Sequence, residues 1–448
     1  MDANTIKWYK NNNLEVTTTS VPDGLYTFVI QHHSSEDGIM NFGQDSSFSG
    51  TETAQNNADG NGEGDFYYSP PSGYLALCSK NLPDVEIGQE ADDLASDYFS
   101  ATLYTGNTAT PRTITGVGFE PGITVTRARG SGSTGMFWDD VRGAGSNKQL
   151  SIATEDEEGT DGSYNSASFG FLSAFNSDGF VLTDGSTNGN WVNENSVTFA
   201  SWNWKLGTAA SGTTSGSGDD ESYSAQVDAD AGQGLVIYEG NGTSGHTIPH
   251  NLNSAPEWIV ARRRNSDNAW FTYHVGADAS APQDKYMVMD TNASVSDQTA
   301  MWNDTAPSST MITVGDSSGT NSNGDDYMMW YAHSVDGYSK FGKYTGNNSA
   351  EGPFVHCGFS PACVITKRVD SSDHWRIYDN KRHTVNDATN PAIKWNDTDT
   401  EADAGNRNID FLSNGFKIRD TDPDTNASGG TYLFLAWAKT PFKYGNAI

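Results

Sequence analysis

The chain has 448 residues, of which 57 are Asp or Glu and 26 are Lys or Arg, so its formal net charge is −31. This balance argues against binding to duplex nucleic acid or to an anionic membrane surface, because both need clustered positive charge. Only 35% of the residues are hydrophobic, but 12 Trp, 19 Tyr and 20 Phe supply large apolar side chains that disordered chains lack, which favours a folded protein.

The N-terminal residues 1–97 differ in pattern from the rest of the chain. They predict three short strands, at residues 6–9, 26–30 and 39–44. Residues 1–13 lack the basic and apolar pattern of a signal peptide, so we expect no export by that route. No apolar run approaches the roughly 18 to 20 residues that a membrane helix needs, so we expect no membrane partner.

Three later segments repeat one pattern. Each contains Tyr-x-Gly-Asn, at residues 104–107, 238–241 and 344–347. Each then has a proline 17 or 18 residues beyond its tyrosine, at Pro121, Pro256 and Pro361. This shared order predicts an internal threefold repeat, which has to be recognised before single elements are assigned.

The strand after each proline carries an apolar pair and then a basic residue on one face, because side chains two apart point the same way. The apolar pairs are Ile123 and Val125, Trp258 and Val260, and Cys363 and Ile365; the basic residues are Arg127, Arg262 and Lys367. Two interpretations stay open for the basic residue. Its stem can lie on the core while its head pairs with an acid such as Asp139 or Asp379. Alternatively, three equivalent cations can grip anionic glycans.

A tryptophan follows each of these strands across a polar hairpin, at Trp138, Trp270 and Trp375, and each copy ends in an aromatic strand. Each copy thus has about 100 residues of short strands and turn signals, which indicates a small antiparallel β-sandwich. We therefore expect an all-β protein of tandem antiparallel β-sandwich modules, lectin-like or jelly-roll-like, with minimal helix. Only residues 90–99 suggest a short helix.

These patterns divide the chain into five parts: residues 1–97 as an incomplete β segment, 98–206 as the first sandwich, 207–232 as a linker, 233–333 as the second sandwich and 334–448 as the third. Residues 207–232 are rich in Ser, Gly and Asp and lack periodicity, which predicts a flexible linker. Only 334–339 join the second and third sandwiches, so we expect those two to pack as a unit.

The N-terminal part resembles a known family. Its Trp-Tyr-x-Asn-Asn start, the Asn-Phe-Gly-Gln string at 41–44 and the Pro-Pro-Ser-Gly-Tyr run at 70–74 resemble the closing half of the concanavalin-like SPRY sandwich of phage structural proteins. The opening half is absent. The resemblance implies either an incomplete sandwich or one that another chain completes, because an open sheet edge invites strand pairing.

The repeats carry a second resemblance, covering roughly residues 98–442. The strings at 224–232, 335–347 and 426–432 resemble those of an uncharacterised domain that is common in virion structural and tail-fibre proteins of marine tailed bacteriophages. The resemblance implies a homo-oligomer, often a trimer in such fibres, located on the virion. It carries over no catalytic residue.

Aromatic side chains in loops are the strongest candidates for a glycan site, because aromatic faces stack on sugar rings. Trp191 and Trp395 lie in loop contexts outside the shared strand pattern, and Trp302 is a weaker candidate. The alternative for each is a loop anchor that packs into the protein.

Alternating acids are the candidates for a metal. Asp420, Asp422 and Asp424 resemble the first half of a calcium loop, but Pro423 and the missing later ligands spoil the EF-hand pattern. We expect no cofactor apart from a loosely bound calcium. The three cysteines are too few for a disulfide framework or a zinc site, so we expect buried free thiols.

The sequence thus favours a non-enzymatic virion structural protein of a tailed phage. It would be assembled in the host cytoplasm and exposed on the particle as a tail fibre or a capsid fibre or decoration, beside other virion proteins and a host-surface glycan. One alternative is a dedicated carbohydrate-binding module. Another is a glycan depolymerase, although no residue spacing selects a catalytic carboxylate pair.

Overall fold

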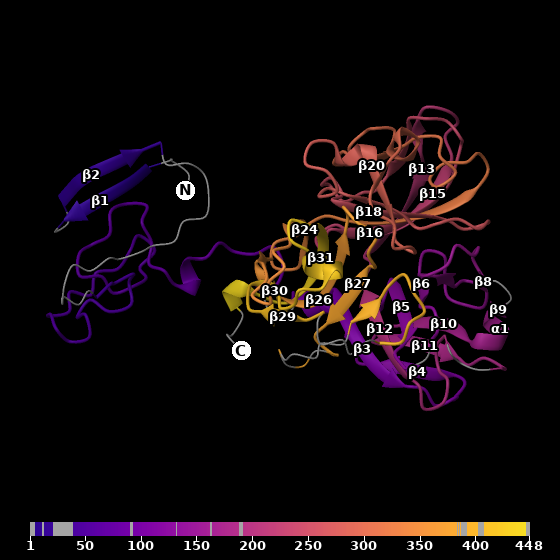
Figure 1. The fold of residues 1–448 in the computed structure, drawn as a ribbon, viewed down its shortest axis with the longest axis horizontal. Helices are drawn as coiled ribbons and strands as arrows, with labels where there is room; N and C mark the ends of the chain where they lie inside the picture. Colours follow the sequence, from indigo (N-terminus) through magenta and orange to yellow (C-terminus); the bar gives the residue numbers. More distant parts are fainter. Residues whose placement is uncertain are drawn as a thin grey trace. The chain divides into compact units, whose positions relative to one another are not determined.

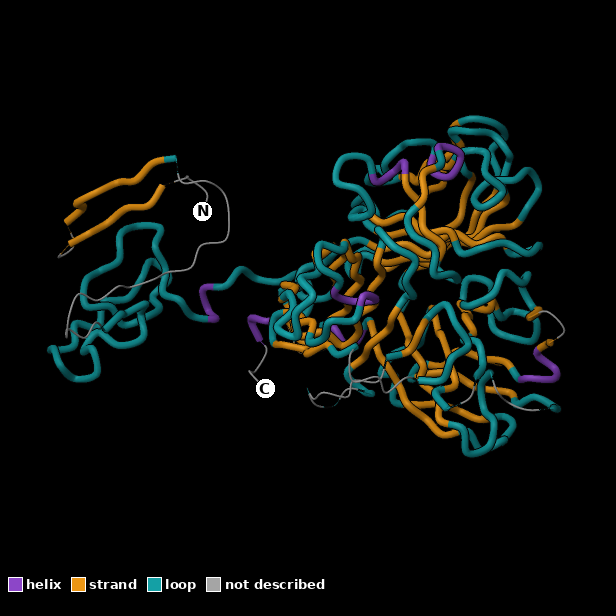
Figure 2. The backbone as a smooth tube through the Cα atoms, viewed as in Figure 1, coloured by secondary structure: helices purple, strands orange, loops and turns teal. Residues whose placement is uncertain are grey.

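The computed structural model describes residues 5–10, 13–20, 39–89, 93–130, 132–161, 164–187, 191–382, 384, 386, 392–401 and 407–444. Strands dominate these ranges, and Figure 2 shows how little of the backbone is helical. No α-helix in them exceeds four residues: α1 (Ser166–Phe169), α2 (Thr299–Trp302) and α3 (Pro423–Asn426). The predicted all-β fold is therefore confirmed. The chain forms two compact units, Met1–Asp84 and Val85–Ile448.

The N-terminal unit contains one hairpin, made of β1 (Thr5–Lys10) and β2 (Asn13–Thr19), and a 3-10 turn, η1 (Ser79–Asn81). The strand predicted at residues 39–44 is wrong. There the side chain of Asn41 accepts hydrogen bonds from the backbone N–H groups of Gly43 and Gln44, which bends the chain into a turn. The strand predicted at 26–30 lies outside the described residues.

Module 1 (residues 98–206) is a sandwich of a five-stranded and a three-stranded sheet. The large sheet has the order β3 (Phe99–Thr105), β12 (Thr198–Trp204), β5 (Ile123–Ala128), β6 (Met136–Asp139) and β7 (Leu150–Ser151). The small sheet has the order β10 (Phe171–Asn176), β11 (Gly179–Thr183) and β4 (Arg112–Thr115), and a short pair, β8 (Thr160–Asp161) and β9 (Tyr164–Asn165), lies outside both. Residues 90–92 of the helix predicted at 90–99 lie outside the described residues. The described remainder contains only a 3-10 turn, η2 (Ala95–Asp97), because pairing with β12 begins at Phe99.

Module 3 (residues 334–448) repeats this plan. Its large sheet has the order β24 (Ser339–Thr345), β31 (Thr431–Pro441), β26 (Phe359–Arg368), β27 (Arg376–Asp379) and β28 (Ile393–Lys394). Its small sheet has the order β25 (Phe354–His356), β30 (Gly415–Ile418) and β29 (Ile409–Leu412). The chain ends in η4 (Phe442–Tyr444).

Module 2 shares the plan and adds strands at one edge. The shared strands are β16 (Gln233–Glu239), β23 (Asp326–Ala332), β18 (Trp258–Arg263), β19 (Phe271–His274) and β20 (Lys285–Val288), facing β17 (His246–Pro249) and β22 (Met311–Val314). A short β21 (Ser296–Asp297) extends the large sheet, and η3 (Pro282–Asp284) precedes β20.

The flexible linker predicted at residues 207–232 is wrong. This segment forms β13 (Thr208–Thr213), β14 (Ser215–Gly216) and β15 (Ser222–Asp228). β15 pairs antiparallel with β16, β13 pairs with β15, and β14 pairs with β17. The physical reason is an alternation hidden among small polar residues, because Ala225 and Val227 point into the module's core while Ser224 faces solvent. We therefore define module 2 as residues 207–333.

The large sheets are buried on both faces. One face covers the small sheet of its own module, and the other face meets the other two modules in a shared core. Consequently β5, β18 and β26 are buried along nearly their whole length, without the alternation of a half-exposed strand. Figure 1 shows these strands where the three modules converge. At that point Trp204 of module 1 packs edge-to-face against Trp330 of module 2 and Trp437 of module 3.

Candidate functional site

The repeated tyrosine is a packing residue. Tyr104, Tyr238 and Tyr344 each stack on the aromatic ring directly across the strand pair, with ring centroids 5.1, 5.4 and 4.9 Å apart. Each hydroxyl donates to a backbone carbonyl, at Val192, Thr320 and Thr425, over 2.8, 2.6 and 2.9 Å. The apolar and the polar part of the side chain are thus both satisfied inside the module.

The Gly-Asn that follows the tyrosine fastens the strand to a buried asparagine. The backbone N–H groups of Asn107, Asn241 and Asn347 donate to the side-chain oxygens of Asn193, Asn321 and Asn426, all three of which are fully buried. The glycine is needed for close approach. A Cβ at Gly106, Gly240 or Gly346 would lie 1.9, 2.4 or 2.2 Å from a backbone oxygen of this neighbouring segment. The whole repeated motif therefore serves the fold.

The repeated basic residue joins one module to the next. Arg127 of module 1 donates to the carbonyls of Lys394 and Asp399 of module 3, and Arg262 of module 2 donates to the carbonyl of Asp156 of module 1. Lys367 of module 3 donates to the carbonyl of Asn292 of module 2 over 3.2 Å. The three modules therefore contact one another in one cyclic order.

Burial lowers the pKa of these three side chains. They are at most 1% exposed, and loss of hydration lowers the pKa of both arginines to about 10 and that of Lys367 to about 8. They are out of reach of a glycan, so that interpretation is wrong. The other interpretation, a side chain with its stem on the core and its charged end paired with an acid, is correct for the buried stem. It is wrong for the acid, because Asp139 and Asp379 pair instead with Arg142 and Arg382 at 2.5 Å.

Two residues beyond each basic position, a backbone hydrogen bond joins the two modules. The carbonyls of Arg129, Arg264 and Val369 accept hydrogen bonds from the N–H groups of Glu401, Glu158 and Val295, at 2.8, 2.8 and 3.0 Å. The first two side-chain pairs are ion pairs, Arg129 with Glu401 at 2.7 Å and Arg264 with Glu158 at 2.6 Å. The third is a valine pair packed on the shared core. The sequence did not reveal Glu158 and Glu401, because hairpins of different length precede them.

The repeated tryptophan is not one structural position. The strand register places Trp138 level with Tyr273 and Tyr378, whereas Trp270 and Trp375 precede their strands and are level with Gly135. The indole N–H groups of Trp270 and Trp375 donate across the interface to the carbonyls of Ser151 and Val288, over 2.8 and 3.0 Å. At the interface of modules 1 and 3, Gly135 stands where the other two modules have tryptophan. There Arg127 donates to the carbonyl of Lys394, which is equivalent in position to those of Ser151 and Val288.

The three tryptophans predicted as glycan platforms are buried. Trp191, Trp302 and Trp395 are 3, 1 and 2% exposed, so their faces cannot stack on a sugar. Trp191 packs in the core of module 1, Trp302 in that of module 2, and Trp395 in the shared core beside Trp202. Each tryptophan packs into the protein and anchors its loop, which was the alternative to a glycan-binding role.

The acids predicted as calcium ligands have other partners. Asp422 caps α3 by accepting from the N–H of Asp424, and Asp424 pairs with Arg376 and Arg407. Asp420 is 3% exposed, accepts from the hydroxyl of Thr425 over 2.6 Å, and burial raises its pKa to about 6. No group of three or more His, Cys, Asp or Glu in the described ranges is arranged to hold a metal ion. Cys78, Cys357 and Cys363 are free thiols, the last two of them buried.

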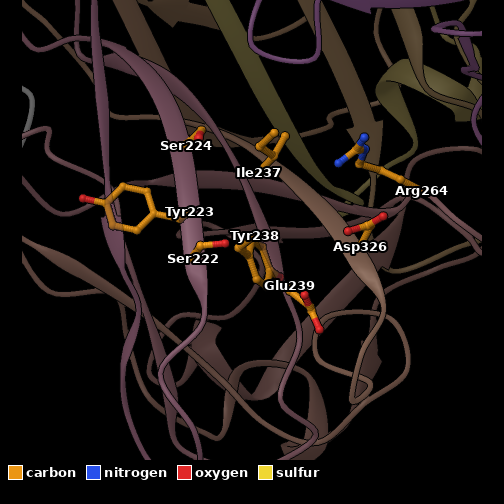
Figure 3. Close-up of a pocket in the computed structure, with 8 residues that line it drawn as sticks. All are labelled: Ser222, Tyr223, Ser224, Ile237, Tyr238, Glu239, Arg264 and Asp326. Carbon is orange, nitrogen blue, oxygen red and sulfur yellow. The ribbon is translucent and has the colours of Figure 1, made fainter.

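A shallow groove on module 2 brings hydroxyl, carboxylate and guanidinium groups together. It has a volume of about 130 Å3 and is lined by Ser222, Tyr223, Ser224, Ile237, Tyr238, Glu239, Arg264 and Asp326. Figure 3 shows Tyr223 at one end and Arg264 with Asp326 at the other. Glu239 and Asp326 are cross-strand partners, and both are exposed. The sequence did not reveal the groove because one wall, β15, belongs to the segment predicted as a linker.

Residues 94–441 match the family model described as a domain of unknown function (DUF7483). The match spans well over half of the chain, so the protein belongs to this family. No curated protein matches the chain. No solved structure matches it either. In the described part of the chain, no helix has the length and apolar character that crossing a bilayer demands.

Proposed function

We propose that the protein is a non-enzymatic structural protein of a tailed-phage virion, exposed on the particle as a tail fibre or as a capsid fibre or decoration. One observation carries the proposal. In every copy the repeated residues are used to build the module or to join it to the next, as Tyr104, Gly106 and Arg127 do in module 1. A chain whose repeated residues serve construction alone is suited to a mechanical role.

The cyclic arrangement supports the same role. Each interface combines a buried cation, a backbone hydrogen bond and either an ion pair or an apolar pair. Separating the modules would also expose their shared apolar core, including Trp204, Trp330 and Trp437, to water, which costs about 25 cal/mol for each Å2 of apolar surface. An appendage that meets shear and changing salt needs such resistance.

The test is to locate the protein on particles. An antibody raised against the recombinant chain should label intact purified virions at one defined place, and electron microscopy would separate tail from capsid. Mass spectrometry of the same particles should find the chain in a fixed ratio to the major capsid protein. Recovery only from the soluble fraction of infected cells, with unlabelled particles, would overturn the proposal.

A second candidate function is binding of a host-surface glycan in the module 2 groove. The hydroxyls of Ser222 and Ser224 and the carboxylates of Glu239 and Asp326 can exchange hydrogen bonds with sugar hydroxyls, and Ile237, the cross-strand partner of Ser224, supplies an apolar floor. We expect Ser224→Trp, which blocks the groove from an exposed position, to abolish glycan-array binding. The matched control Ser254→Trp adds the same side chain at an exposed serine outside the groove.

Two results would reject glycan binding as the role of this groove. One is wild-type protein that binds no glycan on the array, and the other is binding that survives Ser224→Trp. Release of new reducing ends from a bound polysaccharide would point to the depolymerase alternative instead, and Glu239→Gln would then test whether a groove carboxylate is required.

A further inference from the structure

Module 2 contains three histidines, His246, His250 and His274, whose side chains are fully buried. His246 begins β17, His250 follows the end of β17, and His274 ends β19. Among the described histidines of modules 1 and 3, His356 is exposed and His374 is partly exposed. In the described part of the chain, fully buried imidazoles are therefore a feature of module 2.

Hydrogen bonds hold the ring of His250 in its neutral form. Its Nδ1 accepts from the backbone N–H of Leu252 over 3.3 Å, and its Nε2 lies 3.0 Å from the carbonyl oxygen of Ser308. Because a carbonyl oxygen only accepts, the ring carries its proton on Nε2, and a second proton would have to enter Nδ1 opposite an N–H group. The titratable side chains that face the ring, His333 and Tyr331, supply no negative charge to balance that proton.

His274 follows the same pattern at the boundary of modules 2 and 3. Its Nδ1 accepts from the backbone N–H of Gly276 over 2.9 Å, and its Nε2 donates to the carbonyl of Phe434 in module 3 over 3.4 Å. The charged side chain that acts on this ring is Lys343, a cation, which opposes a second positive charge. Burial is the larger cause, and it lowers the pKa of both His250 and His274 to about 4.

His246 is held by the side chain of Asn241, whose Nδ2 lies 2.7 Å from Nδ1 of the ring. The Oδ1 of the same amide accepts from the backbone N–H of Thr243, so the amide nitrogen is the atom turned toward the imidazole. Burial lowers the pKa of His246, against the opposing effects of the Ser217 backbone and of Asp220. All three rings thus accept an N–H group at the atom that a second proton would occupy.

The strand register shows what stands in place of His274 in the other two modules. It is level with Asp139 of module 1 and with Asp379 of module 3. Each aspartate forms a buried ion pair with an arginine three residues further on, Arg142 or Arg382. An aspartate–arginine pair stays charged near pH 6, whereas an imidazole in water gains a proton there. Of these three equivalent positions, the one in module 2 is therefore the one that responds to weak acid once water reaches it.

We propose that module 2 is the acid-sensitive part of the chain, which opens in weak acid as His246, His250 and His274 take up protons. The closed module excludes these protons, so each proton that the open form binds shifts the equilibrium toward opening. Opening also withdraws Trp258 and Trp330 from the core that the three modules share, so that acid loosens the whole arrangement. This property does not depend on the particle role proposed above.

The pH window follows from His250 and His274. Their pKa falls from 6.5 to about 4 on folding, so their contribution to stability is fully present above about pH 6.5 and is lost as the pH falls toward 4. Asp290 and Asp420 act in the opposite sense, because burial raises the pKa of each carboxyl to about 6. The test therefore compares each histidine variant with wild type over the same pH range.

The experiment measures proton uptake on unfolding, from the slope of the unfolding free energy against pH between pH 5 and 6. His250→Asn and His274→Asn each keep an acceptor oxygen near the Nδ1 position but cannot gain a proton. Each should lower the uptake by about one proton relative to wild type. His246→Asn should lower it by less, because Asp220 favours protonation within the fold. His356→Asn, which removes an exposed histidine, is the control and should leave the uptake unchanged.

Two measurements on wild-type protein need no variant. The NMR signals of the His250 and His274 rings should stay unchanged in the closed form between pH 7.5 and 5.5, while that of the exposed His356 shifts. Hydrogen exchange at pH 5.5 should show protection lost in β17 and β19 at least as much as in β5 and β26. The proposal would be overturned by an uptake that none of the three variants lowers, by a closed-form His250 or His274 that titrates near pH 6.5, or by protection lost first in β5 or β26.

Discussion

At the residue scale, several buried ionisable groups are hydrogen-bonded within the fold. Arg262, Lys367 and Asp420 all lose hydration on folding, and the pKa of each moves toward the neutral form. The two cations recover part of this cost by donating to carbonyls of a neighbouring module. Asp420 accepts hydrogen bonds from Thr425 and from the backbone of Asp422.

Asp420 gives a prediction with a defined sign. Because burial raises its pKa from 3.8 to about 6, its stabilising contribution is complete below about pH 4 and is lost as the pH rises through 6. We expect Asp420→Asn to match wild type near pH 4 and to exceed it by about 2 kcal/mol in unfolding free energy at pH 7.5. Urea unfolding at both pH values measures this difference.

The calcium hypothesis makes the opposite prediction for the same variant. If Asp420 were a calcium ligand, calcium would raise the wild-type melting temperature at neutral pH, and Asp420→Asn would remove that gain. We expect neither effect, because Asp422 and Asp424 are engaged by α3 and by arginines. A calcium-dependent gain that Asp420→Asn abolishes would contradict this assignment.

At the element scale, the sequence predicted the strands that recur in all three modules and missed a strand, β15, that is found in module 2. The Tyr-x-Gly-Asn motif and the strand after the proline recur at fixed spacing, so the register of β5, β18 and β26 could be anticipated. β15 occurs only in module 2. Its alternation of Tyr223, Ala225 and Val227 was present in the sequence, but a half-exposed tyrosine, an alanine and a valine among polar residues gave a weak signal.

The role of β15 can be tested with two substitutions on one strand. Val227→Asp places a carboxylate in the core of module 2 and should lower the unfolding free energy by about 3 kcal/mol. Ser224→Asp puts the same side chain on the exposed face of the strand and should change it by less than about 0.5 kcal/mol. Equal, small effects of both would mean that the segment behaves as a linker.

At the scale of the whole molecule, the sequence predicted three sandwiches but not their cyclic arrangement. The interface acceptors are backbone carbonyls, such as those of Ser151, Val288 and Lys394, which any residue can supply. Side-chain patterns therefore cannot reveal them. The burial of Trp191, Trp302 and Trp395 was equally hidden, because a loop tryptophan that anchors and one that binds sugar have the same local sequence.

The cyclic arrangement predicts that the three modules unfold together. Hydrogen exchange in β5, β18 and β26 should report one common opening free energy, because each module shares buried contacts with the other two. Arg264→Glu places like charges at the interface of modules 1 and 2, beside Glu158, and should lower that free energy by a common amount of about 3 kcal/mol in all three strands. Lys80→Glu is the control, since its ion pair with Glu63 lies in the separate N-terminal unit. Unchanged exchange in β26 of the Arg264→Glu variant would show that module 3 unfolds independently and that the cyclic contacts do not couple the modules.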